Sequence, residues 1–363
     1  MIRIEEVMSG TEKLVYSLMD LYGKYGYSRY RMSKFEEYSL YGKNIDFLVS
    51  DSVITFTDTN GKLMALKPDV TLSIVKNAKD VPDGVTKVCY NENVYRVSKG
   101  TGAFKEIMQA GLECIGDVDR CLVGESLALA AESLKLTGKK YVLAVSHLGL
   151  LSLAVDKITD DGMIKGKILG CVGKRNIHGI KEICVEYGID PAKASSLIEL
   201  LSVYGTPDTA LSKLEKLFGA AGAECIEEMA EALSVFSGDD GRSVTVDFSV
   251  TADANYYGGI VFKGFVDGVP DSVLSGGCYD KLMRKLGKKS RAVGFAVYVD
   301  TLERIFDDGK EYDFDVMIKY TDGTKPSSLK KISDKFIDEG KTVFCCKTPC
   351  GVRCRETFVL EEA

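Results

Sequence analysis

The chain has 363 residues, a formal net charge of −6 at pH 7 and a hydrophobic fraction of 45%. These values are those of an ordinary globular protein of one or two domains, and they argue against a protein dominated by nucleic-acid binding, which normally has a basic face. Eleven cysteines without a signal peptide predict reduced thiols and a cytoplasmic location, and no stretch is apolar enough for a membrane span.

The first part of the chain alternates between helix and strand patterns. Apolar residues three and four apart predict helices, and apolar residues in alternation predict strands. Gly26 is placed to end the first helix, and Asn60-Gly61 predicts a two-residue hairpin turn. The expected elements are a helix at 14–25, strands at Val53–Thr57 and Lys87–Tyr95, and a helix at Asp119–Leu136.

The rest of the chain predicts a helical block, more strands and a small tail. Residues 1–306 are expected to form a core with a helical insertion at about 162–240, and residues 307–363 a truncated α/β appendage. The expected elements are helices at Ile177–Tyr187, Ala192–Tyr204, Thr209–Phe218 and Cys225–Phe236, strands at Ser243–Ser249, Gly259–Val266 and Ala292–Val299, and a strand-helix-strand tail at Phe314–Lys319, Ser328–Glu339 and Thr342–Cys346.

Four groups of residues, in chain order, resemble histidyl-tRNA synthetases and their class II relatives. Together they cover roughly residues 26–304, and their order makes the resemblance specific. They are Tyr25-Gly26-Tyr27-Ser28-Arg29-Tyr30 with Glu36, Phe56-Thr57-Asp58 through Leu66-Lys67-Pro68-Asp69-Val70-Thr71, Val94-Tyr95-Arg96 through Gln109-Ala110-Gly111-Leu112-Glu113-Cys114, and Tyr256-Tyr257-Gly258-Gly259 through Gly276-Gly277-Cys278-Tyr279-Asp280 and Val293-Gly294-Phe295-Ala296.

The resemblance implies an α+β fold of the class II synthetase type: an antiparallel sheet flanked by helices, with a helical insertion and a small α/β tail. In class II relatives the helix and strand of the first motif form the dimer interface. A homodimer is therefore implied as well, within a larger hetero-oligomer.

The chemistry of amino-acid activation requires fixed cations, because charge builds up on the phosphate oxygens of ATP. The positions at which the resembling synthetases carry arginines hold Ala252, Thr301 and Ala103 here, and Ser98 replaces a usual glutamate. Tyr298 stands where glycine is usual. Losing one such donor lowers the rate by about 10²–10³, so we expect no catalytic residues and no synthetase activity.

One arginine of the second motif is retained. Arg96 could keep a residual phosphate contact, although a single arginine after a strand is as often structural. Arg304 could replace the missing third-motif arginine only if the local alignment shifted.

The amino-acid pocket of the resembling family is better preserved. Asp69 and Glu113 could pair with an ammonium or a ring N–H, and Gln109 offers both a donor and an acceptor. Tyrosines could form the wall around an imidazole ring. The residues at the histidine-binding positions are Asp69, Thr71, Gln109, Glu113, Tyr256, Tyr257 and Gly277.

A retained pocket with deleted catalysis is typical of the regulatory subunits of short-form ATP phosphoribosyltransferase, which resemble histidyl-tRNA synthetase cores. The resemblance implies a non-catalytic subunit that activates the catalytic subunit of that enzyme, with histidine as effector and without a cofactor. The tail has 10 basic and 12 acidic residues from residue 307 onward, a poor surface for tRNA. The alternatives are a catalytic histidyl-tRNA synthetase and a synthetase paralogue with an RNA-related role.

Simpler interpretations of the candidate residues remain open. Asp69 could cap a helix that begins at Val70, and both roles can coexist. Gln109 and Glu113, on one face of a strand, could be exposed to solvent. Tyr256 and Tyr257 would point to opposite faces of a strand, which leaves open which of them faces the pocket.

Two glycine- and cysteine-rich segments also have simple interpretations. Gly276-Gly277 could be a hairpin turn. The spacing of Cys346, Cys350 and Cys354 does not match a zinc site, so these thiols are expected to be structural and no metal is expected.

Overall fold

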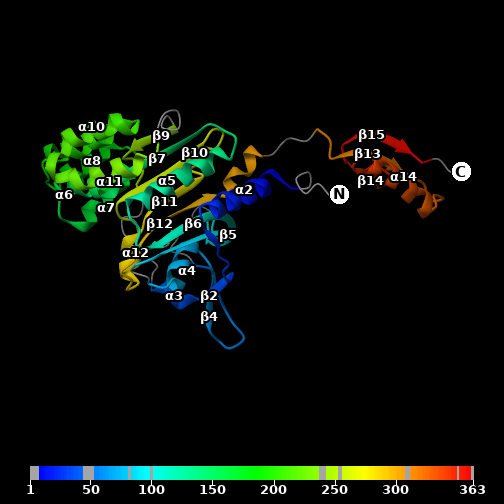
Figure 1. Cartoon of the computed structure of the whole chain (residues 1–363), viewed down its shortest axis with the longest axis horizontal. Coiled ribbons are helices and arrows are strands. Elements are labelled where there is room, and N and C mark those ends of the chain that lie inside the picture. The colour runs from blue at the N-terminus through cyan, green and yellow to red at the C-terminus, as the bar shows by residue number, and fades with distance from the viewer. Residues whose placement is uncertain are drawn as a thin grey trace. The chain divides into compact units, whose positions relative to one another are not determined.

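A computed structural model describes residues 8–43, 53–80, 83–98, 101–236, 243–251, 256–306, 311–349 and 351–360. The chain forms two compact units, Met1–Phe306 and Asp307–Ala363. They are called the core unit and the tail unit below (Figure 1).

A nine-stranded sheet organises the core unit. Its six central strands, from β5 to β7, are antiparallel. Because β1 runs parallel to β5 and β9 runs parallel to β7, the sheet is mixed. The strand order is β1 (Ser28–Arg29), β5 (Val85–Val97), β6 (Phe104–Gly116), β12 (Arg291–Tyr298), β11 (Leu274–Cys278), β10 (Ile260–Val266), β7 (Tyr141–His147), β9 (Val244–Asp247) and β8 (Tyr204–Gly205).

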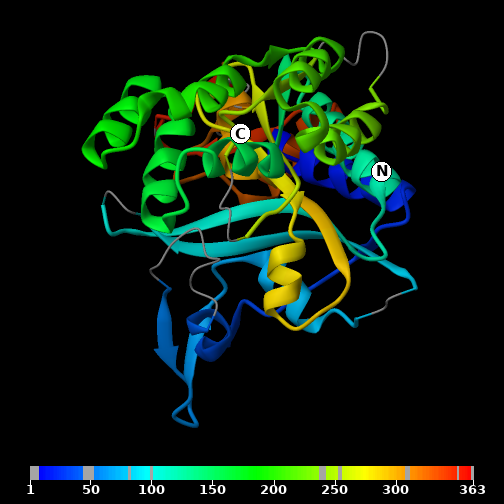
Figure 2. The ribbon, with the colours of Figure 1, turned by 90° about the vertical axis from the view of Figure 1, so that its left-hand side faces the viewer.

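Long helices cover one face of this sheet. Helix α2 (Gly10–Lys24) packs on β5 and β6, and α5 (Arg120–Lys135) packs on β12, β10, β7 and β11. Both begin with side-chain caps, Ser9 in a capping box with Glu12 and Asp119 on the backbone N–H of Leu122. The sheet separates these helices from the elements on its other face, where α12 (Asp280–Lys285) and α4 (Val70–Asn77) lie (Figure 2).

A small three-stranded sheet precedes α4 in the chain. Its strands are β2 (Phe35–Glu37), β4 (Leu63–Leu66) and β3 (Thr55–Thr57), all antiparallel, and α3 (Tyr38–Gly42) follows β2. Figure 2 shows this sheet extending away from the large one. A second hydrophobic cluster, which includes Tyr41, Leu72 and Tyr90, joins α3 and α4 to β5 of the large sheet.

Helices dominate the segment between β7 and β9. Ile168, Leu197 and Leu214 are among the side chains that they bury in the main hydrophobic core. The helices are α6 (Leu148–Asp156), α7 (Gly162–Val172), α8 (Ile177–Glu186), α9 (Ser195–Ser202), α10 (Pro207–Phe218) and α11 (Ala223–Leu233). None of the helices within the described ranges is long and apolar enough to cross a membrane.

The tail unit contains three parallel strands and one helix. The strands lie in the order β14 (Val343–Cys346), β13 (Phe314–Lys319) and β15 (Cys354–Val359), with α14 (Pro326–Asp338) between β13 and β14 in the chain. The strand-helix-strand prediction missed β15. Five of its six residues are exposed, and Arg355 and Glu356 are charged, so an alternating apolar pattern is weak there.

Several local predictions are confirmed. The first helix ends before Gly26, which has a φ of 84°. Gly61, with a φ of 80°, lies in a hairpin turn between β3 and β4 as predicted, but the turn is longer than two residues, because the last paired residues are Thr57 and Leu63. The helix predicted from Asp119 to Leu136 is α5 with its two cap residues.

Candidate functional site

Glu113 lies at the centre of a buried polar cluster beneath α4. It belongs to β6 and only 1% of its surface is exposed. One of its carboxylate oxygens accepts a hydrogen bond from the Thr71 hydroxyl, and the other accepts one from the Tyr279 hydroxyl, both at 2.6 Å. Two sequence-predicted residues, Thr71 and Glu113, are therefore in direct contact, and Tyr279 joins them.

A neighbouring glycine makes room for this carboxylate. Gly294 pairs with Glu113 across β12 and β6, and a Cβ atom at Gly294 would lie 1.9 Å from a Glu113 oxygen and 2.5 Å from the Leu112 carbonyl oxygen. Any other residue at position 294 would therefore displace the carboxylate or separate the strands.

Asp69 is the N-cap residue of α4, as the cap interpretation proposed. Its side chain accepts a hydrogen bond of 2.7 Å from the backbone N–H of Leu72, and burial raises the pKa of its carboxyl group. The Leu72 hydrogen bond and the positive charge of Arg96 act in the opposite direction on this pKa. Arg96 itself donates from Nε to the Pro68 carbonyl oxygen at 3.1 Å, so it holds the start of α4.

Tyrosine rings surround the cluster. The rings of Tyr256 and Tyr257 are 4.6 Å apart, and the rings of Tyr256 and Tyr279 are 6.0 Å apart. The expectation that Tyr256 and Tyr257 point to opposite faces of a strand was wrong, because both precede β10, which begins at Ile260. The loop before the strand turns both rings toward the cluster, and both pack against the second hydrophobic cluster.

Gly277 lies on the large sheet beside the Tyr257 ring, and Gln109 lies on β6 of the same sheet. Gly277 is within β11, so the hairpin-turn interpretation was wrong, and a Cβ there would approach the Tyr257 ring to 3.0 Å. Gln109 is 4% exposed, and Glu113 less, so the solvent-exposed interpretation of this pair was also wrong. The two share one face of β6, and Gln109 pairs with Tyr298 of β12.

The electrostatics of the cluster favour protonated groups. Burial, with a smaller contribution from the nearby Asp69 carboxyl, raises the pKa of Glu113 to about 8 against the opposing hydrogen bonds from Thr71 and Tyr279. Burial also raises the pKa of Tyr256 and Tyr257 well above the ordinary value, so their hydroxyls remain hydrogen-bond donors.

Two of the positions predicted to lack phosphate-binding cations, Ala103 and Thr301, lie near the N-terminal end of β6, away from Glu113. Thr301 lines a cavity of 440 Å³, in which the cations are Lys105 and Arg304 and the acids are Glu106, Asp271 and Asp300. The acids outnumber the cations there. Tyr298 donates to or accepts from Ser275 at 2.5 Å, on the sheet face that Gln109 shares. Ala252, the other altered position, lies outside the described residues.

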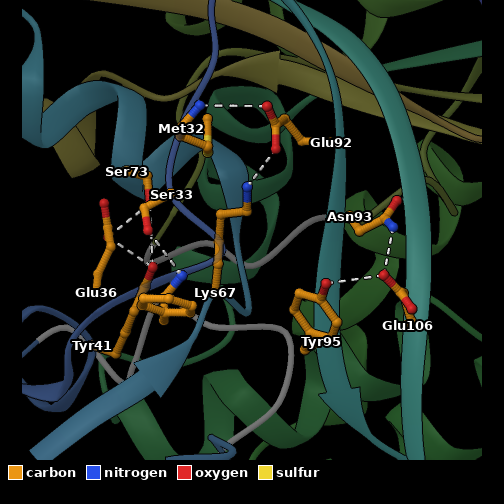
Figure 3. Close-up of polar contacts among 11 residues, drawn as sticks. Met32, Ser33, Glu36, Tyr41, Lys67, Ser73, Glu92, Asn93, Tyr95 and Glu106 are labelled. Carbon is orange, nitrogen blue, oxygen red and sulfur yellow. Dashed lines mark hydrogen bonds and ion pairs between the residues drawn. The ribbon is translucent and has the colours of Figure 1, made fainter. Parts of the chain in front are cut away.

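Two further polar groups hold the small sheet and α4 against the large sheet (Figure 3). Lys67, 1% exposed, forms an ion pair of 2.9 Å with Glu92 of β5. Glu36 accepts hydrogen bonds of 2.9 Å from the hydroxyls of Tyr41 and Ser73, which connect α3 with α4. These contacts hold the segment that carries Asp69 and Thr71 in place. The motif around Pro68 is therefore anchored to both α3 and β5.

Ion pairs connect the helical insertion to the large sheet near Tyr279. Glu228 of α11 lies 3.1 Å from Nε2 of buried His147 and 3.6 Å from the guanidinium of Arg291. Arg291 in turn forms an ion pair of 3.0 Å with Asp280, the residue after Tyr279. A continuous set of polar contacts therefore joins the insertion to the neighbourhood of the Glu113 cluster.

Sequence reasoning missed Tyr279 as a site residue. It stands directly after the Gly276-Gly277-Cys278 segment, and its hydroxyl reaches Glu113 from the end of β11. The sequence signal that could have identified Tyr279 as a site residue was its position directly after the end of β11. Within the described ranges the cysteines are free thiols, and no group of three or more His, Cys, Asp or Glu side chains could hold a metal ion. Cys350 lies outside those ranges.

The mixed sheet, the helical insertion and the cluster below α4 define a protein of the histidyl-tRNA synthetase type, and the histidyl-tRNA synthetase family model matches residues 5–302. ATP phosphoribosyltransferase regulatory subunits from Caldanaerobacter subterraneus and Thermoanaerobacter pseudethanolicus are 30% and 28% identical to the chain, over 77% and 91% of it and 74% and 88% of the relatives. The chain therefore belongs to the histidyl-tRNA synthetase family and, within it, to the ATP phosphoribosyltransferase regulatory subunits.

Solved structures agree on the fold. A regulatory subunit/histidyl-tRNA synthetase from Bacillus halodurans superposes with a TM-score of 0.74 at 22% identity, over 96% of this chain and 93% of that chain. A chain of the ATP phosphoribosyl transferase (HisG:HisZ) complex from Thermotoga maritima gives 0.63 at 19% identity, over 79% and 96%.

Proposed function

We propose that this chain is a non-catalytic regulatory subunit that assembles with the catalytic subunit of a short-form ATP phosphoribosyltransferase. In this role it activates the catalytic subunit in the cytoplasm and contributes to feedback inhibition by histidine. Membership of the regulatory-subunit family supports the role, and the HisG:HisZ complex is an assembly that contains a chain of similar fold.

The charge of the cavity at Thr301 is the observation on which the lack of catalysis depends. Two cations and three carboxylates line this cavity, and Thr301 in its wall stands at the sequence position where the resembling synthetases carry an arginine that holds ATP. A triphosphate carries several negative charges and requires an excess of fixed cations. The cavity offers the opposite balance.

The second and third motifs support the same conclusion. Arg96 is engaged with the Pro68 carbonyl oxygen, and Lys67 is buried in its ion pair with Glu92. Tyr298, which forms a hydrogen bond with Ser275, occupies the position of β12 where glycine is usual in the resembling synthetases. Its bulky side chain therefore covers the strand there. An adenylation step would therefore lack both the cations and the open strand surface.

Histidine is the proposed effector, bound by the cluster around Glu113. The cluster supplies carboxyl groups, tyrosine rings and a buried amide, which suit an imidazole-bearing zwitterion. The residues proposed for this role are Asp69, Thr71, Gln109, Glu113, Tyr256, Tyr257 and Gly277, with Tyr279 added from the geometry.

A homodimer is part of the proposal. Helix α2 and the segment after it expose Tyr16 at 59%, Tyr25 at 45% and Phe35 at 48%, and Phe35 contacts the exposed Phe56 ring on the small sheet. Exposed aromatic side chains in the first-motif region are the residue types enriched at protein interfaces.

Reconstitution tests the function. The chain and a short-form catalytic subunit are co-expressed, and phosphoribosyl transfer is measured with each subunit alone, with both, and with both plus histidine. We expect activity only in the mixture, and inhibition by histidine. Robust histidine-dependent pyrophosphate exchange by the chain alone would replace the proposal with a catalytic synthetase.

A further inference from the structure

Strand β6 is paired along its whole length on one edge and along only part of its length on the other. Its register with β5 runs from Phe104 to Gly116, whereas its register with β12 begins at Gln109, opposite Tyr298. Among the described residues, the start of β6 therefore has no strand neighbour on the β12 side. This stretch, residues 104–108, is called the free edge of β6 below.

The backbone of Glu106 has unmet hydrogen-bonding groups at the free edge. Alternate residues of a strand direct their N–H and C=O groups to the same side. The Met108 N–H points to the free edge, because it donates to an Asp300 carboxylate oxygen at 2.9 Å. The N–H and C=O of Glu106, two residues earlier, therefore point the same way, and no hydrogen bond to them is found at this edge within the described part of the chain. Such an edge is a template for another strand.

The cavity of 440 Å³ at Thr301 lies along this free edge. Lys105, Glu106 and Ile107 of β6 line it, together with the loop 269–271 between β10 and β11 and residues of α13 (Val299–Leu302). Space is therefore present beside the unmet backbone groups. Strand addition requires this combination, in which main-chain hydrogen bonds hold the added segment and neighbouring pockets select its side chains.

The charges that line the cavity are of both signs. Asp271, Lys105 and Arg304 form no ion pair or hydrogen bond with another described residue. The Asp300 carboxylate already accepts its hydrogen bond from the chain, and the Glu106 carboxylate is turned to donors on β5 (Figure 3). Complementary charges at interfaces fix partner and register. This lining therefore favours a polypeptide with acidic and basic side chains over an ion of one sign.

Phe104 adds an apolar contact at the start of the free edge. Its side chain is 73% exposed, and exposed aromatic side chains are of a type enriched at protein interfaces. The aromatic residues assigned above to the homodimer lie on α2, directly after it and on the small sheet, and none of them lines the cavity. The free edge is therefore available to a partner other than a second copy of the chain.

We propose that the free edge of β6 binds an extended segment of the catalytic subunit, which adds a strand to the large sheet by pairing with the backbone of Glu106. The segment carries a basic side chain for Asp271, an acidic one for Arg304 and an apolar one for Phe104. The proposal rests on the proposed function, because that function supplies the partner. It places the partner on the same strand as Glu113, at the opposite end from the proposed histidine cluster.

Proline at position 106 tests the backbone pairing, because it removes the N–H directed at the free edge and leaves those that point to β5. The full-length chain is titrated with a short-form catalytic subunit in a calorimeter. We expect Glu106→Pro to weaken assembly about tenfold. Glu106→Gln keeps the N–H and is the matched control, with an expected loss of about twofold or less. Denaturant unfolding of both variants identifies a proline that disturbs β6 itself.

Charge reversal tests the chemistry of the segment without altering the strand. Asp271 and Arg304 are exposed, so Asp271→Lys and Arg304→Glu should leave the unfolding transition unchanged. Each should weaken assembly about fivefold to tenfold at low salt and less at high salt. Glu215→Lys, on an exposed position of α10 in the insertion, is the matched control and should assemble as the wild type does.

Amide hydrogen exchange separates an added strand from a contact between side chains. The Glu106 amide should exchange quickly in the free chain and slowly in the complex. Equal assembly of wild type and both charge-reversal variants, or a Glu106 amide that still exchanges quickly in the complex, would overturn the inference and leave the proposed function standing. Slow exchange of this amide in the chain alone at high concentration would assign the edge to a second copy and overturn it too. If the wild type does not assemble with the catalytic subunit, the proposed function fails, and the occupant named here fails with it.

Discussion

The two ends of strand β6 carry carboxyl groups in opposite environments. Glu113, near the C-terminal end, is buried beneath α4, and burial raises its pKa to about 8. Glu106, near the N-terminal end, is exposed and accepts hydrogen bonds from Asn93 at 2.5 Å and Tyr95 at 2.9 Å, which lower its pKa (Figure 3). One strand therefore holds a carboxyl group that keeps its proton and another that releases it.

The contrast follows from what covers each end. Around Glu113, the absence of side chains at Gly294 and Gly277 lets the carboxyl group and the Tyr257 ring lie directly on the sheet. Around Glu106, β6 extends beyond the end of β12 at Tyr298, and Phe104 is 73% exposed. The closed end suits selective binding of a small ligand, and the open end is lined by more acids than cations. The difference matches the proposed function, in which a synthetase-like core keeps a ligand cluster and lacks nucleotide chemistry.

Gly294→Ala should have the largest effect. Its Cβ would lie 1.9 Å from the Glu113 carboxylate and 2.5 Å from the Leu112 carbonyl oxygen, so β6 and β12 must shift. We expect a loss of about 3 kcal/mol or more in the free energy of unfolding, measured by denaturant titration. Gly166→Ala is the matched control, because nothing lies within 4 Å of its Cβ position on α7, and alanine there should stabilise the chain slightly. Equal effects at the two glycines would contradict the close packing at Glu113.

Thr71→Val should follow, with a cost that depends on pH. The variant keeps the shape of the side chain and removes one of the two donors to Glu113. Above about pH 8 the carboxyl group is ionised, and losing a hydrogen bond to a buried charge costs about 1.5–3 kcal/mol. At about pH 6 the group is protonated and the cost should be smaller. Unfolding at the two pH values measures the difference, and a cost independent of pH would show that Glu113 does not titrate in this range.

Asp69→Ala should cost less, about 1 kcal/mol, because it removes the N-cap of α4. Asp69→Asn keeps a capping oxygen and removes the negative charge, so it should retain most of the stability while lowering the pKa of Glu113. Thermal unfolding of the two variants separates the cap from the charge. If both lose the same stability, the cap hydrogen bond is not the main contribution of Asp69.

Local sequence signals predicted the helix ends and the turn because each depends on interactions between residues that are close in the chain. The capping position of Asp119, the turn at Gly61 and the end of the first helix at Gly26 each depend on backbone groups a few residues away. The β15 strand was missed because five of its six residues are exposed, the charged Arg355 and Glu356 among them, and because its pairing with β13 joins segments that are distant in sequence.

The candidate cluster required contacts that local patterns do not encode. Thr71 and Glu113 were named from a family resemblance, but their hydrogen bond joins residues 42 positions apart. Tyr279 reaches Glu113 from 166 positions away. The assumption that Tyr256 and Tyr257 lie on a strand failed because β10 begins only at Ile260. The burial of Glu113, which raises its pKa, depends on α4 packing over the sheet. The sequence near Glu113 does not encode that contact.

The smallest effect is expected at the open end of β6. Phe104→Ser removes a side chain that is 73% exposed, so little apolar burial is lost, and the free energy of unfolding should change by no more than about 0.5 kcal/mol. Residue 104, the first of β6, would still pair with Val97 of β5, because that pairing uses backbone groups. If the variant instead reduces activation of a catalytic subunit while stability and histidine binding remain unchanged, the open end of β6 contacts the partner. If stability falls by several kcal/mol, Phe104 packs against the chain in solution, and the contrast between the two ends of β6 is smaller than its exposure indicates.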